Sequence, residues 1–191
     1  MANDASLVQL IADGKIYLNL VDNPTWPTDA DFSPSTNDWA EIGYYSEDGF
    51  TLSPQPGDET EFMGHNGDIV ETDQLPGFWT FAFSALEYRK EIVEAYFDTT
   101  VQSDGSFEVD RASVNTERKL LGVGISKQGD KVFYACPRVK VSEREDIVHN
   151  RTTLLAHGLT FRTFKGTPPG AAPGAEGYQF KAWATKLADE S

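Results

Sequence analysis

The strongest pattern in the chain is Phe78-Trp79-Thr80-Phe81-Ala82-Phe83-Ser84-Ala85-Leu86. Within it, the large side chains of Trp79, Phe81 and Phe83 alternate with short or polar ones. A period of two places alternate side chains on opposite faces of a β-strand. The pattern therefore predicts a strand with one buried aromatic face, which requires a sheet around it.

The same period recurs on both sides of this strand. Further strands are predicted at 14–20, 40–46, 58–65, 68–75, 121–125, 132–141, 159–163 and 178–184. Gly129-Asp130 separates two of these runs and is typical of a hairpin turn. We therefore expect a chain that is mostly β.

One segment, residues 87–97, has a different period. Tyr88, Ile92, Ala95 and Tyr96 recur at helical spacing, with charged residues between them. Such spacing places the apolar side chains on one side of an α-helix of about three turns. The sequence therefore predicts a single helix that packs its apolar side against the sheet.

The length of the chain, 191 residues, suits one domain with a sizeable core, and a second full domain would be cramped. We therefore expect a single domain over 1–191. Cys136 is the only cysteine, so no internal disulfide can form and a reducing compartment is favoured. No apolar run is long enough to span a membrane.

Two segments lack a regular pattern. Residues 21–38 contain three prolines, several aspartates and no Lys or Arg. A loop of this length is usually functional or disordered. Residues 166–177 are rich in Gly, Ala and Pro, which predicts a flexible segment before the last strand. The pattern leaves open whether that strand pairs within its own subunit or with a neighbour.

The net charge is concentrated in the first 75 residues. They hold fifteen carboxylates and one base, Lys15, whereas the remaining acids and bases balance. A one-sided acidic surface repels polyanions, which argues against DNA or RNA as a tightly bound ligand. Two interpretations stay open: a surface past which nucleic acid slides without sticking, or simple solubility.

Signatures of catalysis and of metal binding are incomplete. Gly122-Val123-Gly124 begins like a dinucleotide-binding fingerprint, but Lys127 stands where the third glycine should be. Asp29 and Asp31 resemble the start of a calcium loop, but Pro34 occupies the position of the required glycine. We therefore expect no enzyme activity, no metal and no cofactor.

The tryptophans Trp26 and Trp39 flank the acidic, proline-rich loop. Tryptophan is over-represented among the residues that dominate binding at interfaces. The two side chains are therefore expected either to cap the core or to serve as contact anchors.

The run Trp39-Ala40-Glu41-Ile42-Gly43-Tyr44-Tyr45-Ser46-Glu47-Asp48-Gly49-Phe50 resembles the major tail tube proteins of long-tailed bacteriophages. Members of that family often carry a tryptophan, then an apolar-Gly-Tyr strand, then Ser-Glu-Asp-Gly. The order that follows is also similar: an acidic strand (59–63), a glycine-containing turn (64–67), an Ile-Val strand (68–75), the aromatic strand (78–86) and a helix ending in Tyr96-Phe97. Two features depart from the family pattern, namely Glu71 and Asp73 in place of common basic residues, and the 166–177 segment.

The resemblance implies a β-sandwich or barrel with one flanking α-helix, an architecture that recurs in the ring protein of the type VI secretion needle. It also implies that six copies form a ring, that rings stack into a tail tube, and that DNA passes through the lumen into the host without specific binding. The protein would be a structural part of the virion, assembled in the host cytoplasm. Its partners would be further copies of itself and the tape-measure, tail-tip and terminator proteins.

Site residues can be assigned on this basis. The candidate lumen acids are Glu59, Glu61, Glu71 and Asp73. The loop 21–38 is expected to be an arm that reaches the next ring, mobile in the free subunit and ordered on contact. Its candidate contacts are Asp22, Trp26, Asp29, Asp31, Phe32 and Trp39.

Two other functions stay open at this point. One is a monomeric ligand-binding β-sandwich. The other is a different ring-forming protein of the same fold, such as a secretion-needle ring or a tail terminator.

Overall fold

The computed structural model describes residues 10–189 and is mostly β. The elements in chain order are β1 (Ile11–Asn19), β2 (Trp39–Glu41), β3 (Tyr45–Gln55), β4 (Glu59–Met63), β5 (Ile69–Gln74), β6 (Phe78–Ala85), α1 (Lys90–Phe97), β7 (Arg118–Ser126), β8 (Lys131–Arg144), β9 (His157–Thr163), β10 (Lys181–Ala184) and α2 (Thr185–Asp189). The main sheet has the order β2-β1-β7-β8-β9-β6-β3, β10 also pairs with β8, and β4 and β5 form a separate pair. The predicted mostly-β class is confirmed.

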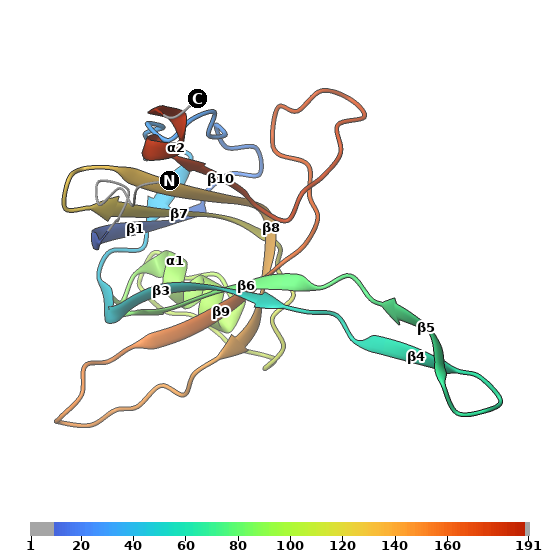
Figure 1. Ribbon diagram of the computed structural model, residues 1–191. Helices are drawn as coiled ribbons and strands as arrows, with labels where there is room; N and C mark the ends of the chain where they lie inside the picture. Colours follow the sequence, from blue (N-terminus) through green and yellow to red (C-terminus); the bar gives the residue numbers. More distant parts are fainter. Residues whose placement is uncertain (1–9, 190–191) are drawn as a thin grey trace.

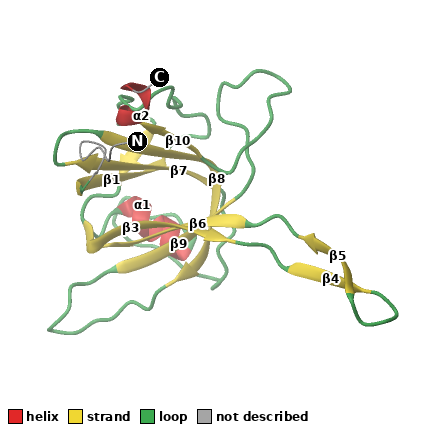
Figure 2. Cartoon of the chain, in the orientation of Figure 1, coloured by secondary structure: helices red, strands yellow, loops and turns green. Residues whose placement is uncertain are grey.

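Strand β8 belongs to both layers of the molecule (Figure 1). Its first half pairs with β7 and β10, whereas its second half, from Val139, pairs with β9. Pro137 lies between the two halves, and proline cannot donate to a ladder of hydrogen bonds. The sheet thus folds over into a first layer of β2, β1, β7 and β10 and a second layer of β9, β6 and β3, which gives a sandwich with little helix (Figure 2).

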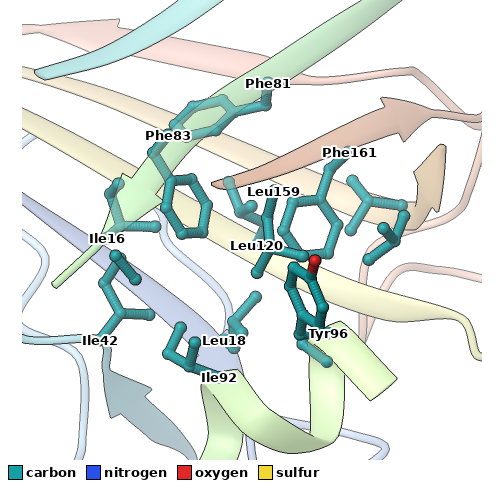
Figure 3. Close-up of a cluster of buried hydrophobic side chains, with 14 of the residues drawn as sticks. Ile16, Leu18, Ile42, Phe81, Phe83, Ile92, Tyr96, Leu120, Leu159 and Phe161 are labelled. Carbon is teal, nitrogen blue, oxygen red and sulfur yellow. The ribbon is translucent and has the colours of Figure 1, made fainter. Parts of the chain in front are cut away.

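The main core lies between the two layers, and α1 packs into it (Figure 3). Ile16 and Leu18 of β1 lie in one cluster with Phe83 of β6 and with Ile92 and Tyr96 of α1. Each large apolar side chain contributes roughly 1.5–3 kcal/mol when it is fully buried. This cluster therefore holds the helix and both layers together, as predicted for Ile92, Ala95 and Tyr96. Tyr88 was also predicted on this side, but it precedes the helix and is exposed.

The other face of the first layer is covered by loop 21–38 and by the C-terminal segment. Leu121 and Phe133 lie on this side, in a second apolar cluster with Trp39. Trp183 of β10 meets the ring of Phe133 edge-on, with centroids 6.3 Å apart. The first layer is thus buried on both faces, which explains why apolar residues are adjacent in β7 instead of simply alternating.

The predicted strand 40–46 is in fact interrupted. Strand β2 ends and β3 begins on either side of Gly43, whose φ is 78°. Glycine adopts this left-handed conformation without strain. The carboxylate of Glu87 lies beside Gly43 and accepts a hydrogen bond from the backbone N–H of Tyr44 (2.9 Å). The break therefore turns the chain from the first layer into the second.

The ends of the helical and C-terminal segments also differ from the prediction. Helix α1 begins at Lys90, three residues later than predicted, and the short helix α2 was not predicted. Strand β10 pairs with β8 of the same chain. Residues Gly166 and Tyr178 pair across the base of the 166–177 segment. The flexibility of that segment and the single-domain organisation stay predictions.

Candidate functional site: assembly surfaces

The hairpin of β4 and β5 projects away from both layers (Figure 1). Every residue of these two strands is exposed. Between residues 56 and 77 the chain carries six carboxylates and no Lys or Arg. The large apolar side chains exposed on this segment are Phe62, Met63, Ile69, Val70 and Leu75. An isolated two-stranded hairpin is at best marginally stable in water, so this segment is the leading candidate for contact with a partner.

A neck of two Pro-Gly steps joins the hairpin to the body. Pro56-Gly57 follows β3, and Pro76-Gly77 precedes β6. The pairing register is the same on both sides of the neck. Gln55 lies opposite Phe78 in the body, and Glu59 lies opposite Gln74 in the hairpin, four residues from each of them. A Cβ on Gly57 would lie 1.8 Å from the carbonyl oxygen of Leu75. Glycine permits this close approach, so β3–β4 and β5–β6 form one continuous ribbon.

The four candidate lumen acids lie on opposite faces of the hairpin. Residues that pair directly in antiparallel strands share a face. The pairs are Glu59 with Gln74, Thr60 with Asp73, Glu61 with Thr72, and Phe62 with Glu71. Glu59 and Glu61 therefore project from one face, and Glu71 and Asp73 from the other. The assignment of these four acids to the lumen stays a prediction, and the hairpin presents them as two pairs on opposite faces.

Loop 21–38 is held against its own subunit. The indole N–H of Trp39 donates to the carbonyl oxygen of Thr25 (3.0 Å), and Trp39 is 2% exposed. The indole N–H of Trp26 donates to the hydroxyl of Tyr178 (3.0 Å). Of the two roles open to these tryptophans, capping the core is the one that this arrangement supports.

The remaining candidate contacts of the loop are one aromatic residue and three aspartates. Phe32 meets the ring of Phe133 edge-on, with centroids 5.9 Å apart. Asp31 forms an ion pair with Lys131 (3.2 Å). The exposed aspartates of the loop are Asp22, Asp29 and Asp31. The loop thus presents carboxylates outward, whereas Trp26, Phe32 and Trp39 contact their own subunit. The assignment of these residues as inter-ring contacts stays a prediction.

The outer face of the second layer carries mostly polar and charged side chains. One cross-strand row is Ser53, Thr80, Arg162 and Lys140, and the next is Thr51, Ala82, Thr160 and Glu143. No residue of these rows belongs to either apolar cluster. The two cations are engaged, because Arg162 lies over the ring of Phe78 (3.7 Å) and Lys140 pairs with Glu117 (3.3 Å).

Two strand edges of the second layer lack a partner strand among the described residues. Strand β3 pairs only with β6, and beyond Val139 strand β8 pairs only with β9. The strands alternate in direction from β3 to the second half of β8. An unpaired edge presents rows of N–H and C=O groups that can pair with another chain. The layer therefore has one open edge on each side.

Comparison with protein families identifies the kind of protein that carries these surfaces. A family model described as a phage tail tube protein matches residues 1–172. The chain belongs to the family of phage tail tube proteins. No curated protein matches it. The resemblance found in the sequence is thereby confirmed, and membership makes the protein a structural component of the phage tail.

Within residues 10–189 of this tail tube protein, neither helix is long and apolar enough to cross a membrane. The same residues contain no group of three or more His, Cys, Asp or Glu side chains that could hold a metal ion. Burial raises the pKa of the Cys136 thiol to about 12. That thiol is protonated near neutral pH, so it is a weak nucleophile and serves as a core residue.

The sequence predicted both strands of the tail tube protein's hairpin but not its projection from the body. A signal for the projection is present, because Pro-Gly occurs at both ends of the segment, at 56–57 and 76–77. Residues 58–61 also lack the apolar side chain that a core-facing strand would carry at alternate positions. Together these features mark a ribbon that continues beyond the core.

Proposed function

We propose that this tail tube protein assembles as hexameric rings that stack into the phage tail tube, the conduit through which DNA is ejected into the host. The observation that carries this proposal is the pair of open edges on the second layer, on β3 and on the second half of β8. Pairing between neighbouring copies would remove both edges at once. The number of six copies comes from the family resemblance.

The strand directions support one continuous sheet around the ring. Four strands alternate in direction in the second layer: the second half of β8, then β9, β6 and β3. Because the number is even, the β3 edge of one copy is antiparallel to the β8 edge of the next. Head-to-tail contacts of this kind form a ring when the rotation between copies closes.

The outer face of the second layer suits the wall of the bore. Thr51, Ser53, Thr80 and Thr160 offer hydroxyl groups on this face. The ring of Phe78, on the same face, is covered by the guanidinium group of Arg162. Loop 21–38 covers the opposite layer, so its aspartates would lie on the outside of the tube. Glu59, Glu61, Glu71 and Asp73 stay candidates for the lining where one ring meets the next, as two alternative pairs because they lie on opposite faces of the hairpin.

The edge pairing can be tested by cysteine cross-linking. Thr51 or Ser53 on β3 is replaced by Cys together with Lys140 or Ser142 on β8, and the assembled protein is oxidised. We expect at least one combination to give a ladder of covalent oligomers that ends at the hexamer. The single-cysteine variants are the controls, and Cys136 contributes little because it is buried.

The outcomes separate the candidate functions. Covalent dimers alone would indicate a two-fold contact and would contradict the ring. Electron microscopy of the uncross-linked protein adds a second criterion: long tubes support the tail tube, isolated rings favour a terminator or needle-ring role, and monomers favour a ligand-binding sandwich. In the finished tail, tape-measure, tail-tip and terminator proteins are the proposed partners, and assembly takes place in the host cytoplasm.

A further inference from the structure

The ribbon that runs from the second layer into the hairpin keeps two distinct faces along its length. On β3, Phe50 faces the core, with its ring stacked on Phe81 at 4.9 Å. The residues on either side of Phe50 face outward, because side chains alternate along a strand. The pairing register is unchanged across the neck, so the alternation can be followed into the hairpin. Phe62 then continues the core-facing series, and Glu61 continues the outward series.

We call residues 56–77 the arm and name its two faces accordingly. The core-continuing face consists of Asp58, Thr60, Phe62, Glu71, Asp73 and Leu75. The outward-continuing face consists of Glu59, Glu61, Thr72 and Gln74. The tip beyond Phe62 belongs to neither set, because a register shift between Phe62 and Met63 breaks the alternation.

The chemistry of the two faces differs. On the core-continuing face, Phe62 is 51% exposed and Leu75 is 56% exposed, whereas Phe81, on the same face of the ribbon within the body, is fully buried. The outward-continuing face carries only polar side chains. Phe62 and Leu75 lie at the two ends of this face, with the Thr60–Asp73 pair between them. Large apolar side chains exposed beside polar groups are typical of a surface that binds another protein. The core-continuing face is therefore the one that requires a partner.

A second copy of this chain fits that face. The arm leaves from one end of the layer that lines the proposed tube (Figure 1), and in a stacked tube the space beyond that end is filled by the next ring. The arm contains no Lys or Arg, whereas fifteen of the sixteen bases of the chain lie beyond residue 75. A neighbouring copy can thus supply cations for Glu71 and Asp73 together with apolar cover for Phe62.

We propose that the arm has a separate role on each face. The core-continuing face docks on a copy in the adjacent ring, and the outward-continuing face keeps Glu59 and Glu61 in the water of the bore, where they repel passing DNA. This inference rests on the proposed tail tube function. It assigns inter-ring contact to the face with Phe62, Glu71, Asp73 and Leu75, and lumen charge to Glu59 and Glu61 alone.

The matched variants Glu61→Cys and Glu71→Cys test this division. Both replace an exposed glutamate on the same hairpin, on opposite faces. Each variant is labelled with a maleimide as the free subunit and as purified tubes, with the wild-type protein as control for Cys136. We expect similar labelling rates in the free subunits. In tubes, labelling of Glu71→Cys should slow by about tenfold or more, as protection on burial requires, while Glu61→Cys stays reactive.

Charge reversal gives a second measurement. The double variant Glu71→Lys/Asp73→Lys should lower the fraction of protein that sediments as tubes, whereas Glu59→Lys/Glu61→Lys should leave that fraction unchanged. Equal protection of both cysteines, or protection of Glu61→Cys alone, would overturn the division of faces while leaving the tube intact. Failure of the wild-type protein to form any ring or tube would instead overturn the proposed function itself.

Discussion

His157 begins strand β9 and is enclosed by aromatic rings from the helical segment. It is 1% exposed, and neither ring nitrogen has a hydrogen-bond partner. The rings of Tyr88 and Tyr96 lie with centroids 5.3 Å from its imidazole. Burial and, to a smaller extent, the nearby His149 lower the pKa of His157. A proton on this side chain would therefore be a charge in the core without compensation.

This arrangement predicts a pH dependence of stability. The unfolded chain takes up a proton on His157 near the ordinary pKa of about 6.5, whereas the folded imidazole stays neutral until a lower pH. We therefore expect the free energy of unfolding to decrease as the pH falls below about 6.5, by at most about 1.4 kcal/mol per pH unit from this group. Urea unfolding across this range measures the slope.

Two variants isolate the contribution of this histidine. His157→Gln should flatten the slope between neutral and mildly acidic pH, because the replacement does not titrate. His65→Gln removes an exposed histidine in the hairpin turn and should leave the slope as it is. A slope that persists in His157→Gln would show that other groups cause it.

At the level of elements, helix α1 is attached to the sandwich chiefly by its apolar side. Ile92 is fully buried and clusters with Ile16, Leu18 and Ile42. Replacing it with Ala should lower the free energy of unfolding by about 2–5 kcal/mol, because the lost methylene and methyl groups leave a cavity. Chemical denaturation measures the change. Leu187→Ala, at a site that is 70% exposed, is the control and should change stability by less than about 0.5 kcal/mol.

The period of two predicted most strands because each carries a core-facing series such as Phe81 and Phe83. The prediction was wrong where the backbone leaves ordinary geometry, as at Gly43, because a positive φ at one glycine has no periodic signature. The sequence left open whether Trp26 caps the core or contacts a partner. The residue that Trp26 contacts, Tyr178, is 152 residues away in the chain, and a contact of that range depends on the completed fold.

The candidate site could be predicted only in part, because the sequence shows which residues are charged but not how the two strands pair. The acids of the hairpin were found because charge is visible in the sequence. Their division between two faces was missed because it depends on the pairing register of Glu59 with Gln74 and Phe62 with Glu71. The sequence of either strand alone does not contain that register.

At the level of the whole molecule, the structure separates a held loop from a projecting arm. In loop 21–38, the backbone N–H of Thr25 donates to the carboxylate of Asp38 (2.8 Å), and the N–H of Trp39 donates to the carbonyl of Ser35 (2.9 Å). The first of these bonds holds the pKa of Asp38 below its usual value. The arm has no comparable attachment beyond its neck, since every residue of β4 and β5 is exposed.

Hydrogen exchange followed by mass spectrometry should show this difference. In the free subunit, we expect amides of loop 21–38 to exchange more slowly than those of residues 58–74, because opening the loop would expose the second apolar cluster. On assembly, protection should increase in 58–74 and change little in the loop. Faster exchange in the loop than in the arm of the free subunit would restore the mobile loop as the assembly element.

The departure of the arm from one end of the sandwich has a consequence for how a tail grows. In a stack of such rings all arms point the same way, so the two ends of the tube cannot be alike. In the proposed hexameric stack, one terminal ring would display six hairpins without a partner ring, and the other would display six unoccupied docking surfaces. Proteins that begin elongation and proteins that stop it would then recognise chemically different surfaces, and each subunit would encode the direction of the tube.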